Sequence, residues 1–177
     1  MCAEPVPEEH RHLLDVAKGE VLCTCRPCSI LFDRREAGGA HYRLIPDRRV
    51  RVGGAGLDDV AWAALGIPVD MAFFVRSSTA GRVVAFYPSP LGTMHSALPL
   101  EAWERVEAAD PALAGMAEDV EALLVNRARG ARDAWLVPLS DCYRLVAVVR
   151  AHWKGISGGD DVTREIARFF ASLPAAS

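Results

Sequence analysis

The spacing of apolar residues along the chain changes near residue 40. Before that point the apolar segments are short and alternate with turn residues. Beyond it they are longer, and they repeat either at every second position, as in a strand, or at the spacing of an amphipathic helix. The segment Ala37-Gly38-Gly39-Ala40 has the composition of a loop. The pattern predicts a small module over residues 1–37 and a larger domain over residues 41–177.

The larger domain contains several segments that are rich in strand-forming residues. A turn is expected at Pro46-Asp47, a hairpin turn at Ser77–Gly81, and a loop over Pro88–Gly92. The predicted strands are, in chain order, His41–Ile45, Arg49–Val52, Met71–Arg76, Arg82–Tyr87 and Ala134–Leu139.

Helical spacing of apolar residues predicts five further segments. They are Leu57–Leu65, Pro99–Ala109, Leu113–Leu124, Cys142–Trp153 and Val162–Leu173. In the third of them, Leu113, Met116, Val120, Leu123 and Leu124 lie on one face of an ideal helix. We therefore expect an α+β fold in which about five mostly antiparallel strands are covered by three or four of these helices.

The first 37 residues resemble a small metal-binding module. His12–Val16 and Glu20–Thr24 alternate as two short strands, with a bend at Lys18-Gly19. The C-x-x-C pair Cys25-Arg26-Pro27-Cys28 then leads into a helical turn, where a proline is well tolerated. Cys2, which precedes Pro5 and Pro7, is expected in a knuckle-like turn. A knuckle, a hairpin and a helix that carries two thiols form the arrangement of zinc ribbons and treble clefs.

The cysteines are the candidate metal ligands. Of the five in the chain, four lie within the first 28 residues. In a reducing compartment, clustered thiols bind metals more often than they form disulfides. Structural zinc takes four ligands in a tetrahedron, and strand alternation places Cys23 on the same face as Cys25. The expected zinc ligands are Cys2, Cys23, Cys25 and Cys28, with His10 and His12 as substitutes.

Two other interpretations of these cysteines remain open. The thiols can be reduced members of a small hydrophobic cluster, or four of them can hold an iron–sulfur centre. The fifth cysteine, Cys142, shares an apolar stripe with Leu145, Val149 and Trp153, which predicts a buried core thiol.

The chain carries no motif of a known catalytic site. It lacks a G-x-S-x-G elbow and a phosphate-binding G-x-x-x-x-G-K loop. The glycine-rich segment Gly53–Gly56 has no βαβ context, so a dinucleotide site is disfavoured. His41, His95 and His152 have no partner at a ligand spacing and are expected to be structural. We expect no catalytic residues.

Composition and charge restrict the class of protein further. Hydrophobic residues make up 51% of the chain and charged residues 24%, which predicts a sizeable core. The net charge of −3 disfavours nucleic-acid binding. The basic segment Arg43–Arg51 is expected to be an exposed strand, with an acidic partner or RNA as the alternative.

No apolar run is long enough to span a membrane, and Met1–Pro5 does not resemble a secretion signal, so we expect a cytoplasmic protein.

Seven short segments, spread over nearly the whole chain, carry a resemblance to a known family. They are Pro5–Leu13, Leu22–Cys28, Met71–Phe74, Ala85–Pro90, Leu98–Trp103, Asp119–Leu124 and Cys142–Val146. In these segments the chain resembles an uncharacterised actinobacterial family, a domain of unknown function encoded near nickel–iron hydrogenase genes. Members begin with a C-x-x-C motif whose second cysteine matches Cys2. The resemblance therefore implies an earlier start, with a further cysteine that completes the metal site.

The gene neighbourhood of that family implies an accessory role in the assembly of a nickel–iron hydrogenase or in its electron transfer. We expect a non-enzymatic zinc-binding protein whose partner is a hydrogenase subunit or maturation factor. The alternative is a redox protein in which the cysteines hold an iron–sulfur cluster or cycle between thiol and disulfide.

Overall fold

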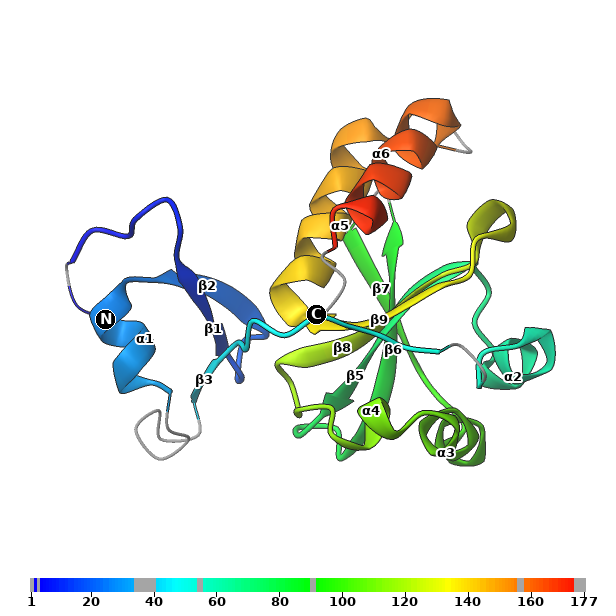
Figure 1. Cartoon of the computed structure of the whole chain (residues 1–177), viewed down its shortest axis with the longest axis horizontal. Coiled ribbons are helices and arrows are strands. Elements are labelled where there is room, and N and C mark those ends of the chain that lie inside the picture. Colours follow the sequence, from blue (N-terminus) through cyan, green and yellow to red (C-terminus); the bar gives the residue numbers. More distant parts are fainter. Residues whose placement is uncertain are drawn as a thin grey trace. The chain divides into compact units, whose positions relative to one another are not determined.

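The chain folds into two compact units, Met1–Asp47 and Arg48–Ser177 (Figure 1). The computed structural model describes residues 2, 4–33, 41–53, 56–89, 92–155 and 158–173. The fold is mixed α+β with antiparallel sheets, as the sequence predicts. The division between the units lies between Asp47 and Arg48, and the predicted loop at Ala37–Ala40 lies outside the described residues.

The N-terminal unit is a three-stranded sheet with one short helix. The strand order is β2-β1-β3, and both outer strands are antiparallel to β1. The predicted strand pair and the helical turn after it are therefore confirmed. The elements are β1 (Arg11–Asp15), β2 (Glu20–Thr24), α1 (Arg26–Leu31) and β3 (Tyr42–Leu44).

A tight turn sets the register of the hairpin between β1 and β2. Gly19 has a φ of +67°, a conformation that glycine adopts without steric cost. Its N–H donates to the Asp15 carbonyl oxygen at 2.8 Å, and the Lys18 N–H donates to the Asp15 carboxylate at 3.2 Å. Leu13 consequently lies opposite Leu22.

The hydrophobic core of the N-terminal unit is small. Among its described residues, the buried aliphatic side chains are those of Leu13, Leu14 and Ile45. The thiols of Cys25 and Cys28 are buried as well. So few buried apolar groups contribute little to the free energy of folding of a unit of this size.

The turn predicted at Pro46-Asp47 is wrong, although the segments on either side, His41–Ile45 and Arg49–Val52, both contain strands. The first segment contributes β3 to the small sheet. The second contributes β4 (Val50–Arg51), which pairs with β9 (Asp133–Pro138) in the other unit. The chain between them therefore passes from one unit to the next instead of turning back. The local sequence predicts that a segment is extended. Which strand it pairs with depends on burial against residues that are distant in the sequence.

The C-terminal unit is built on a six-stranded antiparallel sheet with the order β4-β9-β8-β5-β6-β7. Its other elements are α2 (Asp59–Leu65), β5 (Met71–Ser77), β6 (Arg82–Ser89), β7 (Gly92–Ala97), α3 (Leu100–Ala109), α4 (Pro111–Ala114), β8 (Glu121–Asn126), the 3₁₀ turn η1 (Ala128–Gly130), α5 (Leu139–His152) and α6 (Gly159–Ala171).

Helices cover both faces of this sheet, with α2, α3 and α4 on one side and α5 and α6 on the other (Figure 1). Phe73 and Phe74 are neighbours on β5, so their side chains point to opposite faces. The Phe74 ring lies 5.9 Å from Trp62 on α2 and 5.6 Å from Trp103 on α3. The Phe73 ring lies 6.5 Å from Tyr143 on α5.

The predicted helix over Leu113–Leu124 is wrong. The segment contains only the end of the single-turn helix α4 and the beginning of β8. All six residues of β8 are buried. Because both faces of this central strand are covered, the four residues between its polar ends, Ala122–Val125, are apolar without alternation. Periodicity alone cannot distinguish such a run from part of a buried helix.

The sequence also failed to predict β7, which pairs with β6 at the edge of the sheet. Pro88 and Ser89 belong to β6 and Gly92 begins β7, so most of the predicted loop is strand. Pro90 and Leu91 lie outside the described residues. An edge strand with exposed positions such as Met94 gives only a weak apolar signal.

The last two helices carry the apolar stripes that the spacing predicted. On α5, Cys142, Leu145 and Val149 are buried. Trp153 is the C-cap residue of this helix and is partly exposed, so it is not a full member of the stripe. No helix among the described residues is both long and apolar enough to cross a membrane.

Two arginines of the basic segment Arg43–Arg51 pair with carboxylates in the core of the C-terminal unit. The Arg48 guanidinium donates from Nε and Nη2 to Glu121, at 2.8 and 2.7 Å, and this hydrogen bonding raises the pKa of Arg48. Arg49 Nε donates to Asp141 at 2.6 Å. Glu121 and Asp141 are only 1% and 4% exposed. Part of the basic segment therefore compensates buried negative charge within the same chain.

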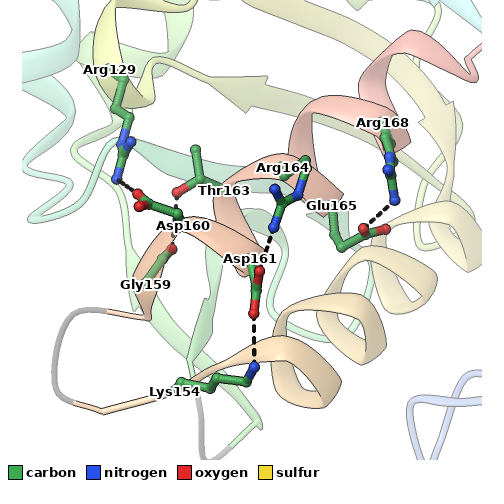
Figure 2. A network of polar contacts seen from close by, with 9 residues as sticks. All are labelled: Arg129, Lys154, Gly159, Asp160, Asp161, Thr163, Arg164, Glu165 and Arg168. Atoms are coloured by element: carbon green, nitrogen blue, oxygen red, sulfur yellow. Dashed lines mark hydrogen bonds and ion pairs between the residues drawn. The ribbon is translucent and has the colours of Figure 1, made fainter.

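Figure 2 shows a contrasting set of polar contacts at the surface, along α6. Lys154 Nζ donates to Asp161 at 2.7 Å, and this hydrogen bond lowers the pKa of Asp161. Arg164 pairs with the same carboxylate, and Arg129 donates to Asp160 at 3.3 Å. Exposed pairs of this kind contribute little to stability. The helix packs instead through its buried apolar side chains, Val162, Phe169 and Phe170.

Arg48→Ala is expected to lower the free energy of unfolding of the C-terminal unit by about 2 kcal/mol. The substitution leaves the Glu121 carboxylate buried without its guanidinium partner, although it still accepts the Ala117 N–H at 2.8 Å. The matched control is Arg129→Ala, because Arg129 and Asp160 are 66% and 90% exposed, and it should change stability by less than about 0.5 kcal/mol. Urea unfolding of the full chain, followed by tryptophan fluorescence, measures both. Equal losses would contradict the internal role of Arg48.

Candidate metal centre

Three thiols converge in the N-terminal unit. Cys2 Sγ lies 3.3 Å from Cys25 Sγ and 3.2 Å from Cys28 Sγ. The side chains of Cys25 and Cys28 are buried, whereas Cys2 is exposed. Sulfur ligands around zinc are about 3.8 Å apart, given a tetrahedron with Zn–S bonds of about 2.3 Å. The three sulfur atoms are therefore close enough to bind one metal ion.

The junction between β2 and α1 positions two of these thiols. Cys25 is the N-cap residue of α1, and its carbonyl oxygen accepts the Ser29 N–H at 2.9 Å. Cys28 lies in the first turn, and its carbonyl oxygen accepts the Phe32 N–H at 3.0 Å. Pro27 fits within this turn because the first residues of a helix need no N–H donor to the helix. One turn of helix thus holds both thiols of the C-x-x-C pair.

The thiols change one another's protonation. A backbone hydrogen bond from Cys28 lowers the pKa of Cys25, but hydrogen bonding to the Cys2 thiol and burial outweigh it, so the net pKa is raised. The pKa of Cys28 is lowered, first by a backbone hydrogen bond from Cys2 and then by the neighbouring thiols. Cys28 therefore loses its proton more readily than Cys25, and the thiolate is the form that binds metals.

The structure separates the predicted ligands into two groups. Cys23 does not lie with the other three thiols; its sulfur groups with ring nitrogens of His10 and His12, all within 4.8 Å of one another. The strand β2 ends at Thr24, and both Thr24 and Cys25 are buried, so the alternation that begins in the strand does not continue to Cys25. His10 and His12 accordingly accompany Cys23.

Cys142 belongs to neither group. It is fully buried in the C-terminal unit, which confirms the predicted core thiol. Burial raises its pKa well above the ordinary value, so the protonated thiol is the stable form. A protonated, enclosed thiol is a poor metal ligand and a poor nucleophile. Of the other histidines, His152 uses Nδ1 to donate a hydrogen bond to the Val148 carbonyl oxygen at 3.0 Å, on the same helix.

Fold and cysteine geometry together define a mixed α+β protein with a candidate metal centre in a small N-terminal unit. The chain belongs to a family of unknown function, DUF5947, which it matches over residues 1–177. That description names neither a source organism nor a hydrogenase. No curated protein and no solved structure is significantly similar to the chain.

Proposed function

We propose that the protein is a non-enzymatic accessory protein whose N-terminal unit is held together by zinc at Cys2, Cys25 and Cys28. The observation that carries this proposal is the convergence of three sulfur atoms, with separations of 3.2 and 3.3 Å from Cys2. Thiolates are soft ligands, and zinc is the common divalent ion that suits them in a structural site. A group outside these three side chains completes the tetrahedron.

The size of the N-terminal unit supports a structural role for the metal. The unit spans Met1–Asp47 and has a core of few aliphatic side chains. Units of about 40 residues usually need a metal, disulfides or a partner to fold. The cysteines are free thiols and form no disulfides, so a bound metal is the cross-link that we propose for this unit. Metal-binding free energy would then be folding free energy for this unit.

The partner that we propose is a component of a nickel–iron hydrogenase, either a subunit or a maturation factor. The resemblance of seven sequence segments to a family encoded near hydrogenase genes supports this choice. A second support is the end of α1, where two adjacent aliphatic side chains, Ile30 and Leu31, are 66% and 58% exposed. Neighbouring exposed aliphatic groups favour a protein contact over a purely solvated surface. The contact would then lie on the helix that carries the metal.

The double variant Ile30→Ser/Leu31→Ser is expected to weaken binding to the hydrogenase component at least about tenfold, which corresponds to about 1.4 kcal/mol. Calorimetric titration of purified subunits and maturation factors with the zinc-loaded protein measures the affinity. The matched control is Val60→Ser, which removes an aliphatic side chain that is 79% exposed on α2. Absence of binding by the unmodified protein would contradict the proposed partner. Equal binding by the double variant would contradict the proposed contact.

The second candidate function is a thiol or iron–sulfur redox protein. The same sulfur separations favour it, because two thiols in van der Waals contact can lose two electrons and two protons to an acceptor and form a disulfide. Visible absorbance of anaerobically purified protein distinguishes the candidates. A colourless protein that contains zinc supports the accessory role. A coloured protein that contains iron and sulfide supports the redox role.

A further inference from the structure

The second ligand group is built by the hairpin that precedes the three thiols. His12 on β1 and Cys23 on β2 are directly opposite one another in the ladder, so their side chains share one face. His10 lies just before β1, and its ring centroid is 4.9 Å from that of His12, with an angle of 55° between the rings. Ring nitrogens of both histidines and the Cys23 sulfur lie within 4.8 Å of one another.

The hydrogen bonds of His10 leave one nitrogen ready to bind. Nδ1 lies 2.9 Å from the carbonyl oxygens of Pro7 and Glu8. A carbonyl oxygen only accepts, so Nδ1 carries the proton and Nε2 of the neutral ring has a free lone pair. Nε2 is buried and has no hydrogen-bond partner among the described residues. Burying a polar atom without a partner costs free energy, and a metal ion bound to Nε2 would offset this cost.

From this geometry we propose a second metal site, formed by His10 Nε2, a ring nitrogen of His12 and Cys23 Sγ, which binds one divalent cation of the zinc class. Histidines that bind metals commonly donate their other ring N–H to a backbone carbonyl, as His10 does. Two imidazoles and a thiolate suit zinc, whereas magnesium and calcium prefer oxygen ligands. This site is distinct from the proposed structural zinc at Cys2, Cys25 and Cys28.

The second site differs from the first in its access to solvent. Cys23 is exposed, and both histidines are half-buried. Three protein ligands leave the fourth position of a zinc tetrahedron open to water or to a group from another molecule. The cation at this site is therefore exchangeable. The first site has two buried thiols and retains its cation longer.

Titration of the metal-free full chain with cobalt(II), under reducing and anaerobic conditions, tests the second site. The unmodified protein is expected to bind about two equivalents, and the Cys23→Ser variant about one. Cobalt at the second site should show about one third of the thiolate charge-transfer absorbance of cobalt at the first, because it has one sulfur ligand instead of three. His41→Asn is the matched control, since His41 is an exposed histidine of the same unit outside both groups, and it should keep both equivalents.

Two results would overturn the second site. One is a single equivalent of cobalt bound by the unmodified protein. The other is an unchanged stoichiometry in Cys23→Ser. Histidine ¹⁵N spectra of the unmodified protein add a measurement that needs no variant: zinc should shift the Nε2 resonances of His10 and leave that of His41 in place. Failure of the second site with one zinc still held at the three thiols leaves the proposed function intact, so the two failures are distinguishable.

Discussion

Replacing Cys28 with serine is expected to release the metal from the three-thiol cluster and to unfold the N-terminal unit. Cys28 is the buried thiol whose pKa is lowered, so it supplies a thiolate that a serine hydroxyl cannot replace. Zinc-finger peptides gain about 10–16 kcal/mol from the metal. The few aliphatic side chains in the core of this unit cannot compensate for such a loss.

Hydrogen exchange of the full chain, with mass-spectrometric detection, locates this effect. In Cys28→Ser, peptides that contain β1, β2 and α1 should lose protection, while those that contain β5 and β8 keep it. A chelator should have the same effect on the unmodified protein. The matched control is Cys23→Ser, which removes a thiol outside the cluster and should preserve protection. Unchanged exchange across residues 4–33 after chelation would contradict a structural metal.

Cys142→Asp is expected to have the second largest effect, a loss of about 4 kcal/mol or more from the stability of the C-terminal unit. The side chain of Cys142 is 0% exposed and lies on the buried stripe of α5 with Leu145 and Val149. A carboxylate there would be enclosed by apolar side chains, and Arg49 and Arg144 already pair with the neighbouring Asp141. Cys142→Ala removes only a small apolar group and should cost about 1 kcal/mol.

Urea unfolding followed by tryptophan fluorescence compares the two variants of Cys142, because all four tryptophans belong to the C-terminal unit. The metal content of Cys142→Ala should equal that of the unmodified protein. Loss of metal from this variant would make Cys142 a ligand and would contradict the assignment of the site to the N-terminal unit alone. Equal stabilities of the aspartate and alanine variants would contradict its burial.

Where local chemistry determines local structure, the sequence was sufficient to predict it. Gly19 fixes the turn between β1 and β2 through its positive φ, and the two strands alternate around it. The helix α2 was predicted from the same kind of signal. Asp58 accepts the Ala61 N–H at 2.8 Å at its start, and Gly66 ends it in the left-handed conformation.

Long-range pairing was not accessible from the sequence. The run Glu121–Asn126 is a strand because helices cover both of its faces, which no pattern within the run reveals. The segment Tyr42–Leu44 pairs with Leu13–Asp15 of β1, which lies far before it in the sequence. The edge strand Gly92–Ala97 has too few apolar residues to give a signal of its own. In each case the determining contact is distant in sequence.

The sequence predicted which residues are candidate metal ligands, but it did not predict which of them lie together. Three of the four expected cysteines converge, whereas Cys23 lies with His10 and His12. A signal for this separation was present in the hairpin. Once Asp15 pairs with Glu20 across the turn, the register places His12 opposite Cys23. The folding of Cys2 onto the C-x-x-C pair, in contrast, depends on the path of the N-terminal segment, for which the sequence has no periodic signal.

The zinc content of Cys23→Ser, compared with that of Cys23→Ser/Cys28→Ser, tests the central claim most directly. The first substitution removes a ligand of the second group and leaves the three converging thiols in place. Elemental analysis after anaerobic purification should find about one zinc per chain in the single variant and almost none in the double variant. A single variant without metal, or a double variant that retains its zinc, would contradict a metal centre at Cys2, Cys25 and Cys28.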